Sequence, residues 1–240
     1  MDDQLKKSLQ DDGFSIMHSV FSSAELDRLE FELDQFFPKT GAHDNAESDL
    51  AGARSRAGQT TFEINRALSR SVYLRRCALF KRVQKLASEF LGCNARYTFD
   101  HAIYKYPGAN SAIGWHQDQA YQRKDLCMRS MHFWIPLQDS SAGNGGLEFS
   151  RGSHNLPLRD HRTINNSGTL EVRDATINQV VSCDVPRGGL SIHLPNTLHR
   201  SLENTSGAVR KAWILHFSPL GKWDILRPKN LSAQLSRIMQ

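Results

Sequence analysis

The sequence predicts a mainly β protein, a jelly roll with helices packed on one outer face. Two observations support this fold class. Apolar residues recur at helical spacing only in the first part of the chain, and from Arg96 onward short β-rich runs alternate with clusters of Gly, Pro, Asn and Ser. Short strands that follow helices in this way are typical of a jelly roll. We expect one domain over residues 1–240, with helical support in 1–92 and the jelly-roll core in 93–220.

The N-terminal part predicts a strand, a helix and a loop, in that order. Residues 13–17 are a strand candidate. Ser22 and Glu25 fit a capping box, and the apolar residues that follow at helical spacing predict a helix that ends at Pro38. Residues 40–60 are rich in small and polar residues, and we interpret them as a mobile loop.

A second helical region is predicted over about residues 66–91, with Gly92 as its stop. Its basic residues could form a nucleic-acid face, but no recognition motif or interleaved aromatic residue accompanies them, so a solvated helix face is expected instead. The residues concerned are Arg70, Arg75, Arg76, Lys81, Arg82 and Lys85.

Eight short runs after residue 95 read as strands. They are 96–105, 112–118, 127–138, 146–150, 179–183, 189–194, 199–203 and 209–217. Residues 151–178 are polar and irregular, and we expect an elaborate loop over the barrel mouth there.

Composition argues against membrane and secreted classes. No apolar stretch approaches the roughly 20 residues that span a bilayer, and the charged N-terminus lacks the features of a secretory signal. The C-terminal SRIMQ is not a peroxisomal address. The four cysteines lack paired spacing and read as free thiols. A cytoplasmic protein is expected; its oligomeric state is left open.

A candidate metal site begins with His116 and Asp118. On a strand, residues two apart point to the same face, so an imidazole and a carboxylate can meet one ion. About 0.7 such His-x-Asp triplets are expected by chance in this composition, so the motif needs context. His199 supplies it, because it starts a late strand, and early and late strands lie side by side in a jelly roll. Two imidazoles and one carboxylate form the facial triad that suits Fe(II), whereas zinc prefers a tetrahedral set with more His or Cys.

Arg210 and Ser201 form a candidate carboxylate receptor. Residues 199–203 and 209–217 read as a hairpin, with Ser201 on the face of His199 and Arg210 opposite on the partner strand. A guanidinium offers a planar fork of two donors to a carboxylate. A chelating keto acid could take two of the three open metal positions, and oxygen the third. The alternative for Arg210 is a surface salt bridge.

These motifs, in this order and spacing, resemble the phytanoyl-CoA dioxygenase (PhyH) family of Fe(II)/2-oxoglutarate oxygenases. The resemblance covers nearly the whole chain. It runs through DGF at 12–14, FLG at 90–92, YKYPG at 104–108, WHQDQAY at 115–121, WIPL at 134–137, NGGL at 144–147, GSH at 152–154, and LHRS at 198–201 with Arg210 eleven residues after His199.

The resemblance implies a double-stranded β-helix that binds Fe(2+), the co-substrate 2-oxoglutarate and O2. His116, Asp118 and His199 would hold iron, and Arg210 and Ser201 the distal carboxylate of 2-oxoglutarate. Further expected contacts of the co-substrate come from Trp134, His101 and Gln117. Because the halogenating relatives lack the carboxylate that Asp118 provides, the resemblance favours hydroxylation or a related C–H oxidation, with release of succinate and CO2.

The substrate wall is the least defined part of the prediction. Its candidates are Tyr104, Tyr121, His132, Arg129, Arg151 and His154. His193 is not expected to be a metal ligand. Two alternatives stay open: a non-catalytic jelly-roll binding module, and a cupin-type enzyme that uses another metal.

Overall fold

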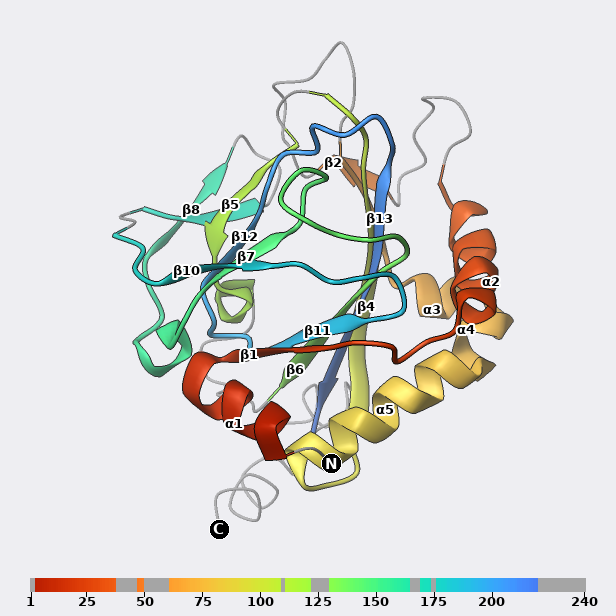
Figure 1. Ribbon diagram of the computed structural model, residues 1–240, viewed down its shortest axis with the longest axis horizontal. Helices are drawn as coiled ribbons and strands as arrows, with labels where there is room; N and C mark the ends of the chain where they lie inside the picture. Colours follow the sequence, from red (N-terminus) through yellow and green to blue (C-terminus); the bar gives the residue numbers. More distant parts are fainter. Residues whose placement is uncertain are drawn as a thin grey trace, which may run out of the picture.

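Two facing β-sheets form the centre of the molecule, and helices cover the outer side of the larger one (Figure 1). The computed structural model describes residues 3–37, 47–49, 61–108, 111–121, 130–164, 169–173 and 176–219. The mainly β jelly-roll fold predicted from the sequence is confirmed.

The larger sheet is antiparallel, with its strands in the order β1-β11-β6-β13-β4-β3-β2. Side chains alternate between its two faces, so one face meets the helices and the other the smaller sheet. Its strands are β1 (Phe14–Met17), β2 (Glu47–Asp49), β3 (Thr61–Asn65), β4 (Arg96–Lys105), β6 (Met131–Pro136), β11 (Leu190–His193) and β13 (Arg210–Ser218).

The smaller sheet has the order β10-β7-β12-β5, also antiparallel. Its strands are β5 (Ile113–His116), β7 (Leu147–Ser150), β10 (Val180–Cys183) and β12 (His199–Ser201). A separate hairpin joins β8 (His161–Ile164) to β9 (Thr169–Val172). Two short 3-10 helices, η1 (Asp118–Tyr121) and η2 (Ser153–Asn155), lie in the connections.

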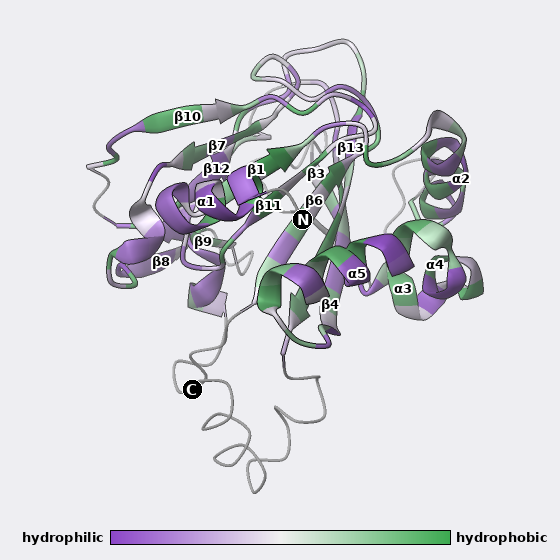
Figure 2. Ribbon diagram, turned by 60° about the horizontal axis from the view of Figure 1, so that its bottom comes forward, coloured by the Kyte–Doolittle hydropathy of each residue, from purple (hydrophilic) through white to green (hydrophobic). Residues whose placement is uncertain are grey.

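The helices are α1 (Asp3–Asp12), α2 (Ser23–Asp34), α3 (Ala67–Arg70), α4 (Val72–Arg76) and α5 (Ala78–Leu91). α2 and α5 bury one face against the outer side of the larger sheet, where Leu29 and Val83 share a core with Phe133 and Leu215. Accordingly, α5 alternates hydrophobic and hydrophilic bands in Figure 2.

A second, smaller core fills the space between the sheets. It contains Trp134 and Ile214 from the larger sheet and Leu147 and Phe149 from the smaller one. Polar side chains of both sheets adjoin this core, and the candidate site lies among them.

The helical predictions were correct in position and partly wrong in extent. The capping box of Ser22 is confirmed, but α2 ends at Asp34 rather than at Pro38. The region 66–91 is three helices rather than one, because the backbone is extended at Ser71 and at Cys77. The side chain of each of these two residues caps the helix that follows it, accepting a main-chain N–H from the first turn of α4 or α5. Gly92 ends α5, as predicted, and it does so in the left-handed conformation (φ 69°).

All eight predicted runs contain a strand, and three further predictions were wrong. Residues 199–203 and 209–217 are not a hairpin: β12 and β13 belong to different sheets. The region 151–178 contains the β8–β9 hairpin. Within 40–60, residues 47–49 form strand β2, and the rest of that loop prediction lies outside the described residues.

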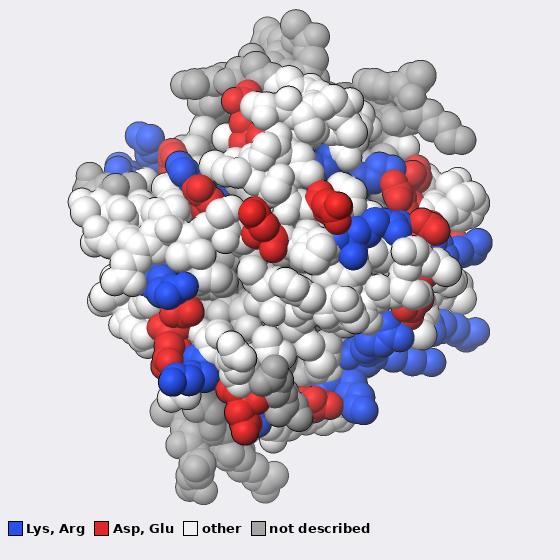
Figure 3. Space-filling model, viewed as in Figure 1, with Lys and Arg blue, Asp and Glu red and all other residues white. Residues whose placement is uncertain are grey.

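The basic helical residues are on the surface, as expected of a solvated face. Lys and Arg gather where α4 and α5 lie (Figure 3), and Arg82 there pairs with Glu25 at 2.9 Å. None of the helices described is long and apolar enough to cross a membrane. Cys77, Cys93 and Cys183 are free thiols, as predicted.

Candidate metal centre

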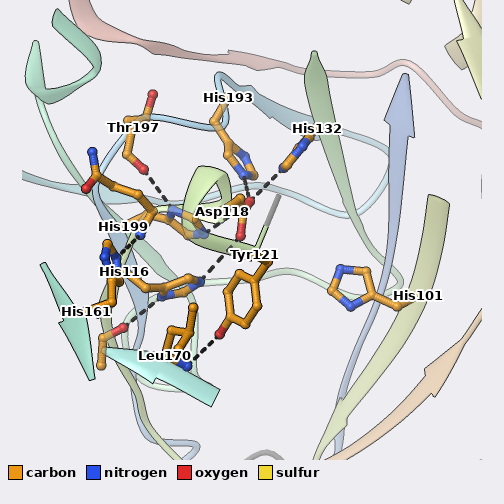
Figure 4. A network of polar contacts seen from close by, with 12 residues as sticks. His101, His116, Asp118, Tyr121, His132, His161, Leu170, His193, Thr197 and His199 are labelled. Carbon is orange, nitrogen blue, oxygen red and sulfur yellow. Dashed lines mark hydrogen bonds and ion pairs between the residues drawn. The ribbon is translucent and has the colours of Figure 1, made fainter. Parts of the chain in front are cut away.

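Three side chains meet between the sheets: His116 at the end of β5, Asp118 at the start of η1, and His199 at the start of β12 (Figure 4). Their potential ligand atoms lie within 4.8 Å of one another. His116 Nε2 is 3.6 Å from Asp118 Oδ1, and His199 Nε2 is 3.8 Å from Asp118 Oδ2. The structure brings His199 to the His116 and Asp118 pair, as predicted, although His116 and His199 are 83 positions apart in the sequence (199 − 116).

Strand pairing brings the two imidazoles together, and a turn brings the carboxylate. His116 and His199 are direct partners in the β5–β12 pair, with ring centroids 4.2 Å apart. The expectation that His116 and Asp118 share a strand face is wrong, because β5 ends at His116. The main-chain N–H of Gln117 donates to His161 Nε2 (3.1 Å), so the chain leaves the strand and turns into η1.

Main-chain carbonyls orient both imidazoles. His116 Nδ1 lies 2.9 Å from the carbonyl oxygen of Gly114, and His199 Nδ1 lies 3.0 Å from that of Thr197. A carbonyl oxygen only accepts, so each Nδ1 carries the hydrogen. Each Nε2 therefore presents its lone pair toward Asp118, which is the arrangement a metal-binding histidine needs.

Burial and nearby charges shift the pKa values of the three side chains in the direction that favours binding of a metal cation. Burial lowers the pKa of His116, and it lowers the pKa of His199 to well below its usual value. Burial alone would raise the pKa of the Asp118 carboxyl, but the nearby imidazoles of His199 and His132 outweigh it and hold that pKa well below its usual range. Imidazoles that give up their protons readily, beside an ionised carboxylate, suit a metal cation, because metal ligands must be deprotonated.

Asp118 also contacts two further imidazoles. His132 Nδ1 is 2.6 Å from Asp118 Oδ2, and His193 Nε2 is 3.1 Å from the same oxygen. His132 was a candidate for the substrate wall, and its actual contact is this carboxylate. Behind it lies His216, stacked on the ring of His132 with centroids 3.7 Å apart.

A buried group of cationic and hydroxyl side chains lies at one end of β13. Arg210 is 2% exposed, and its Nε and Nη1 have no hydrogen-bond partner among the described residues. Its strand partner Lys105 donates to the carbonyl oxygens of Ser201 (3.2 Å) and Leu202 (2.7 Å). The hydroxyl of Ser201 is likewise buried without a partner in the described part of the chain.

The charge of this group favours an anion. Burial lowers the pKa of Arg210 to about 9, which still leaves the guanidinium charged at neutral pH. Burial, with Arg210 nearby, lowers the pKa of Lys105 well below its usual value. The guanidinium lies over the ring of Trp134, 5.5 Å from its centroid. Unpartnered donors on a buried cation are costly unless an acceptor meets them.

The residues therefore fit both expected groups. The donor set of His116, Asp118 and His199 is the two-histidine, one-carboxylate set that suits Fe(II). The orphaned donors of Arg210 and the hydroxyl of Ser201 match the needs of a carboxylate.

Two other residues that were predicted to contact the co-substrate, Gln117 and His101, already form hydrogen bonds with other residues of the protein. Gln117 is fully buried, and its amide donates to Asn196 Oδ1 (2.8 Å) while its carbonyl accepts the N–H of Arg159 (2.9 Å). His101 hydrogen-bonds to Glu63 through Nδ1. His101 lies near the triad in Figure 4, four residues along β4 from Lys105.

The substrate-wall prediction was wrong at three positions. Tyr104 faces the helices, where its hydroxyl donates to Asp34 (2.6 Å). Arg151 forms an exposed pair with Asp12 at the surface, and His154 contacts the carbonyl of Gln10 in α1. These errors share one cause, since a sequence pattern does not say which strand face or loop meets which sheet.

The remaining candidates differ in their positions. Tyr121 lies beside the triad, with its ring centroid 6.3 Å from that of His116, and its hydroxyl accepts the N–H of Leu170. Arg129 lies outside the described residues.

Sequence reasoning missed several residues of the site. His161 supports the turn before Asp118, Lys105 adjoins Arg210, and His216 stacks on His132. A signal existed for His216, which lies on the same strand face as Arg210, six residues further along. No pattern pointed to His161, because the hairpin that carries it was not predicted.

Comparison with known proteins agrees with this site. A family model described as phytanoyl-CoA dioxygenase (PhyH) matches residues 9–212. The crystal structure of EvdO2 from Micromonospora carbonacea var. aurantiaca, complexed with 2-oxoglutarate, is 28% identical and superimposes with a TM-score of 0.78 over 91% of each chain.

Two curated relatives are similar in sequence. A Stutzerimonas stutzeri protein named "Probable alpha-ketoglutarate-dependent hypophosphite dioxygenase" is 25% identical over 90% of this chain and 78% of its own. The Danio rerio phytanoyl-CoA dioxygenase domain-containing protein 1 is 30% identical over 48% of this chain, and the match spans only 42% of that relative's length.

Proposed function

The chain belongs to the phytanoyl-CoA dioxygenase family, and on that premise we propose that it is an Fe(II)- and 2-oxoglutarate-dependent oxygenase acting on a small molecule. The reaction proposed is hydroxylation, or another oxidation at a C–H bond, with release of succinate and CO2. The convergence of His116, Asp118 and His199 is the observation that carries this proposal. The EvdO2 complex with 2-oxoglutarate supports the choice of co-substrate.

In this proposal each group of residues has one task. His116, Asp118 and His199 hold iron, with their ligand atoms already oriented by the carbonyls of Gly114 and Thr197. When bound, iron would activate O2 for the oxidation, and 2-oxoglutarate would supply two of the electrons that O2 takes up, leaving as succinate and CO2.

Arg210 and Ser201 bind the distal carboxylate of 2-oxoglutarate, and Trp134 packs against the guanidinium that does so. Because Arg210 is a buried cation, it attracts the dianionic co-substrate. His101 faces the site from β4 with its Nδ1 held by Glu63, and its other ring nitrogen is assigned the contact with the co-substrate.

The test is a spectrum and a turnover assay. Under anaerobic conditions, Fe(II) and 2-oxoglutarate added to the purified protein are expected to give the weak visible charge-transfer band of a chelated keto acid. In air, succinate release that depends on 2-oxoglutarate is expected from a substrate-library screen. Zinc in place of iron is expected to give neither signal.

Single variants separate this function from its alternatives. His116→Ala and Asp118→Ala are expected to abolish turnover and the band, since each leaves only two ligands. Unchanged activity in either variant contradicts the metal assignment. A protein that binds 2-oxoglutarate but releases no succinate with any substrate would be a binding module, and one active with another metal would be a different cupin-type enzyme.

A further inference from the structure

One oxygen of the Asp118 carboxylate is held by two imidazoles from the opposite sheet. His132 lies on β6 and His193 on β11, whereas the triad comes from β5, η1 and β12. Both imidazoles approach the same atom, Oδ2, at 2.6 Å and 3.1 Å (Figure 4). The 3.1 Å distance is an ordinary hydrogen-bond distance, and the 2.6 Å distance is that of a short hydrogen bond.

The direction of both hydrogen bonds follows from the acceptor. An ionised carboxylate only accepts, so His132 donates through Nδ1–H and His193 through Nε2–H. Two donors on one oxygen occupy its lone pairs. The other oxygen, Oδ1, has neither contact and lies 3.6 Å from His116 Nε2, while His199 Nε2 lies 3.8 Å from Oδ2.

The strand register fixes the position of both donors. His132 and His193 are direct cross-strand partners in the β6–β11 pair, and His216 is the partner of His132 on its other side. The side chains of His132 and His193 are 0% and 3% exposed, so water does not compete for them. Stacking of His216 on His132 limits rotation of that ring.

A second metal site is the alternative, because Asp118, His132 and His193 also form a cluster of possible ligands. The distances argue against it. Ligand atoms about 2.1 Å from one ion lie about 3 Å apart when the angle between them is near 90°. The 2.6 Å between His132 Nδ1 and Asp118 Oδ2 is shorter than that, and it fits a short hydrogen bond to an ionised oxygen better than two ligands of one ion.

We propose that His132 and His193 are positioning residues of the metal centre, which hold Asp118 so that it binds iron through Oδ1 alone. One-point binding by this carboxylate leaves three positions for co-substrate and oxygen, whereas two-point binding would leave two. The inference rests on the function proposed above and extends it to residues on the opposite sheet.

The positioning role can be tested by replacing each histidine with Asn or Gln, because the two amide side chains place their N–H donors at different distances from the backbone. An Asn amide nitrogen can occupy the place of a histidine Nδ1, and a Gln amide nitrogen that of a histidine Nε2. His132→Asn and His193→Gln therefore keep a donor at the right distance, whereas His132→Gln and His193→Asn place it wrongly. His132→Leu and His193→Leu remove the donor, and His18→Leu at the exposed surface is the control.

The measurement is anaerobic Fe(II) affinity of the otherwise unliganded protein, with thermal unfolding as the check on folding. Outer contacts of metal ligands are worth about 10- to 100-fold in affinity. His132→Leu and His193→Leu are expected to weaken Fe(II) binding by that range, with the same loss in His132→Gln and His193→Asn. His132→Asn, His193→Gln and His18→Leu are expected to bind within about threefold of the wild type.

The outcomes distinguish the two proposals. If the wild type binds Fe(II) with 2-oxoglutarate but the Leu variants bind it equally well, only the positioning role is overturned. If His132→Asn binds as weakly as His132→Leu, the imidazole acts as a ligand and the positioning role is also overturned. A wild type that shows neither Fe(II) binding nor the charge-transfer band overturns both.

Discussion

Gly13 connects the N-terminal strand to the metal centre at the scale of a single residue. Its φ is +86°, and a Cβ there would lie 2.4 Å from His154 Nδ1 and 2.7 Å from Thr197 Oγ1. The carbonyl of Gly13 accepts the hydroxyl of Thr197, whose own carbonyl orients His199. Because Gly13 has no side chain, Thr197 can approach closely enough to make this hydrogen bond, and Thr197 in turn orients the proposed metal ligand His199.

Gly13→Ala is expected to destabilise the protein by about 2 kcal/mol, because it adds both backbone strain and a steric clash. Urea unfolding monitored by circular dichroism measures this. Gly207→Ala is the control, since a Cβ at Gly207 would meet nothing within 4 Å and the φ of this residue is not positive. Equal stability of the two variants would contradict the packing described.

Arg210→Lys is expected to raise the 2-oxoglutarate concentration needed for half-maximal succinate release at least about tenfold. An ammonium keeps the charge but loses the planar fork of donors. The maximal rate at saturating 2-oxoglutarate is expected to change much less, because the substitution lies away from the triad. An unaltered 2-oxoglutarate requirement would contradict the assigned role.

The identity of the triad could be predicted from sequence, whereas its supporting contacts could not. The spacing of His116, Asp118 and His199 is a motif. The contacts of Asp118 with His132 and His193 depend on how β6 and β11 pair, and on which face of the larger sheet points inward. Register of that kind is a property of the whole fold, so no local pattern carries it.

At the scale of elements, α2 is fixed by charges at both of its ends. Glu25 closes the capping box with Ser22 and also accepts two hydrogen-bonding contacts from Arg82 on α5, at 3.1 Å and 2.9 Å. At the other end, Lys211 of β13 contacts Asp34 (2.8 Å) and Glu30 (2.7 Å). The helix is thereby held to α5 and to the larger sheet.

The Glu25 contact predicts a pH dependence of stability. The hydrogen bond from Arg82 holds the pKa of Glu25 below its usual value of 4.5. A lowered pKa in the folded state stabilises the fold above pH 4.5, and this contribution is lost as the pH falls through the folded value. Glu25→Gln is expected to cost up to about 1 kcal/mol at pH 7.

The check is urea unfolding of the wild type and Glu25→Gln between pH 7 and pH 3. The difference in unfolding free energy between them is expected to shrink as the pH falls. A difference that is constant with pH would show that the carboxylate charge is unimportant for this contact.

Tyr104 provides a test of which sheet face meets the helices. Its ring stacks on Phe37 and its hydroxyl donates to Asp34. Tyr104→Phe is expected to lower the unfolding free energy by about 1 kcal/mol, because one buried hydrogen bond is lost. The kcat/KM for any substrate found is expected to stay at the wild-type value. A large fall in kcat/KM would show that Tyr104 contributes to the substrate site after all.

β-rich runs bounded by turn residues were predictable, and elements that depend on distant partners were not. β4 was predicted over residues 96–105 because that run is β-rich and the turn residues Pro107 and Gly108 follow it. α1 was missed because it is rich in charge and buries only Leu9. The break at Ser71 was missed because a serine can also lie within a helix, and its cap is recognised only when the next turn is seen.

At the scale of the whole molecule, the metal centre joins the two sheets. The triad belongs to the smaller-sheet side, and the imidazoles that hold Asp118 belong to the larger sheet. Each of the eight runs predicted from the sequence contains a strand, but β12 and β13 were assigned to one hairpin. The error arose because a short polar segment, such as the one between β12 and β13, can form either a tight hairpin turn or a connection that crosses from one sheet to the other.

This placement predicts that metal stabilises the entire fold. Fe(II) at about 100 times its dissociation constant is expected to add about 2.7 kcal/mol to the unfolding free energy. Anaerobic differential scanning calorimetry with Fe(II), and again after chelation by EDTA, measures the change. His199→Ala is expected to show no such increase, and an equal increase in that variant would place the ion elsewhere.

Strand β1 gives the amino end of the chain an unexpected importance for protein engineering. It is the edge strand beside β11, where Phe14 pairs with His193. A shortened version that starts beyond Met17 would keep every ligand of the proposed centre and still uncover the strand that carries His193. Affinity tags and truncations at this end are therefore best judged by iron content as well as by yield.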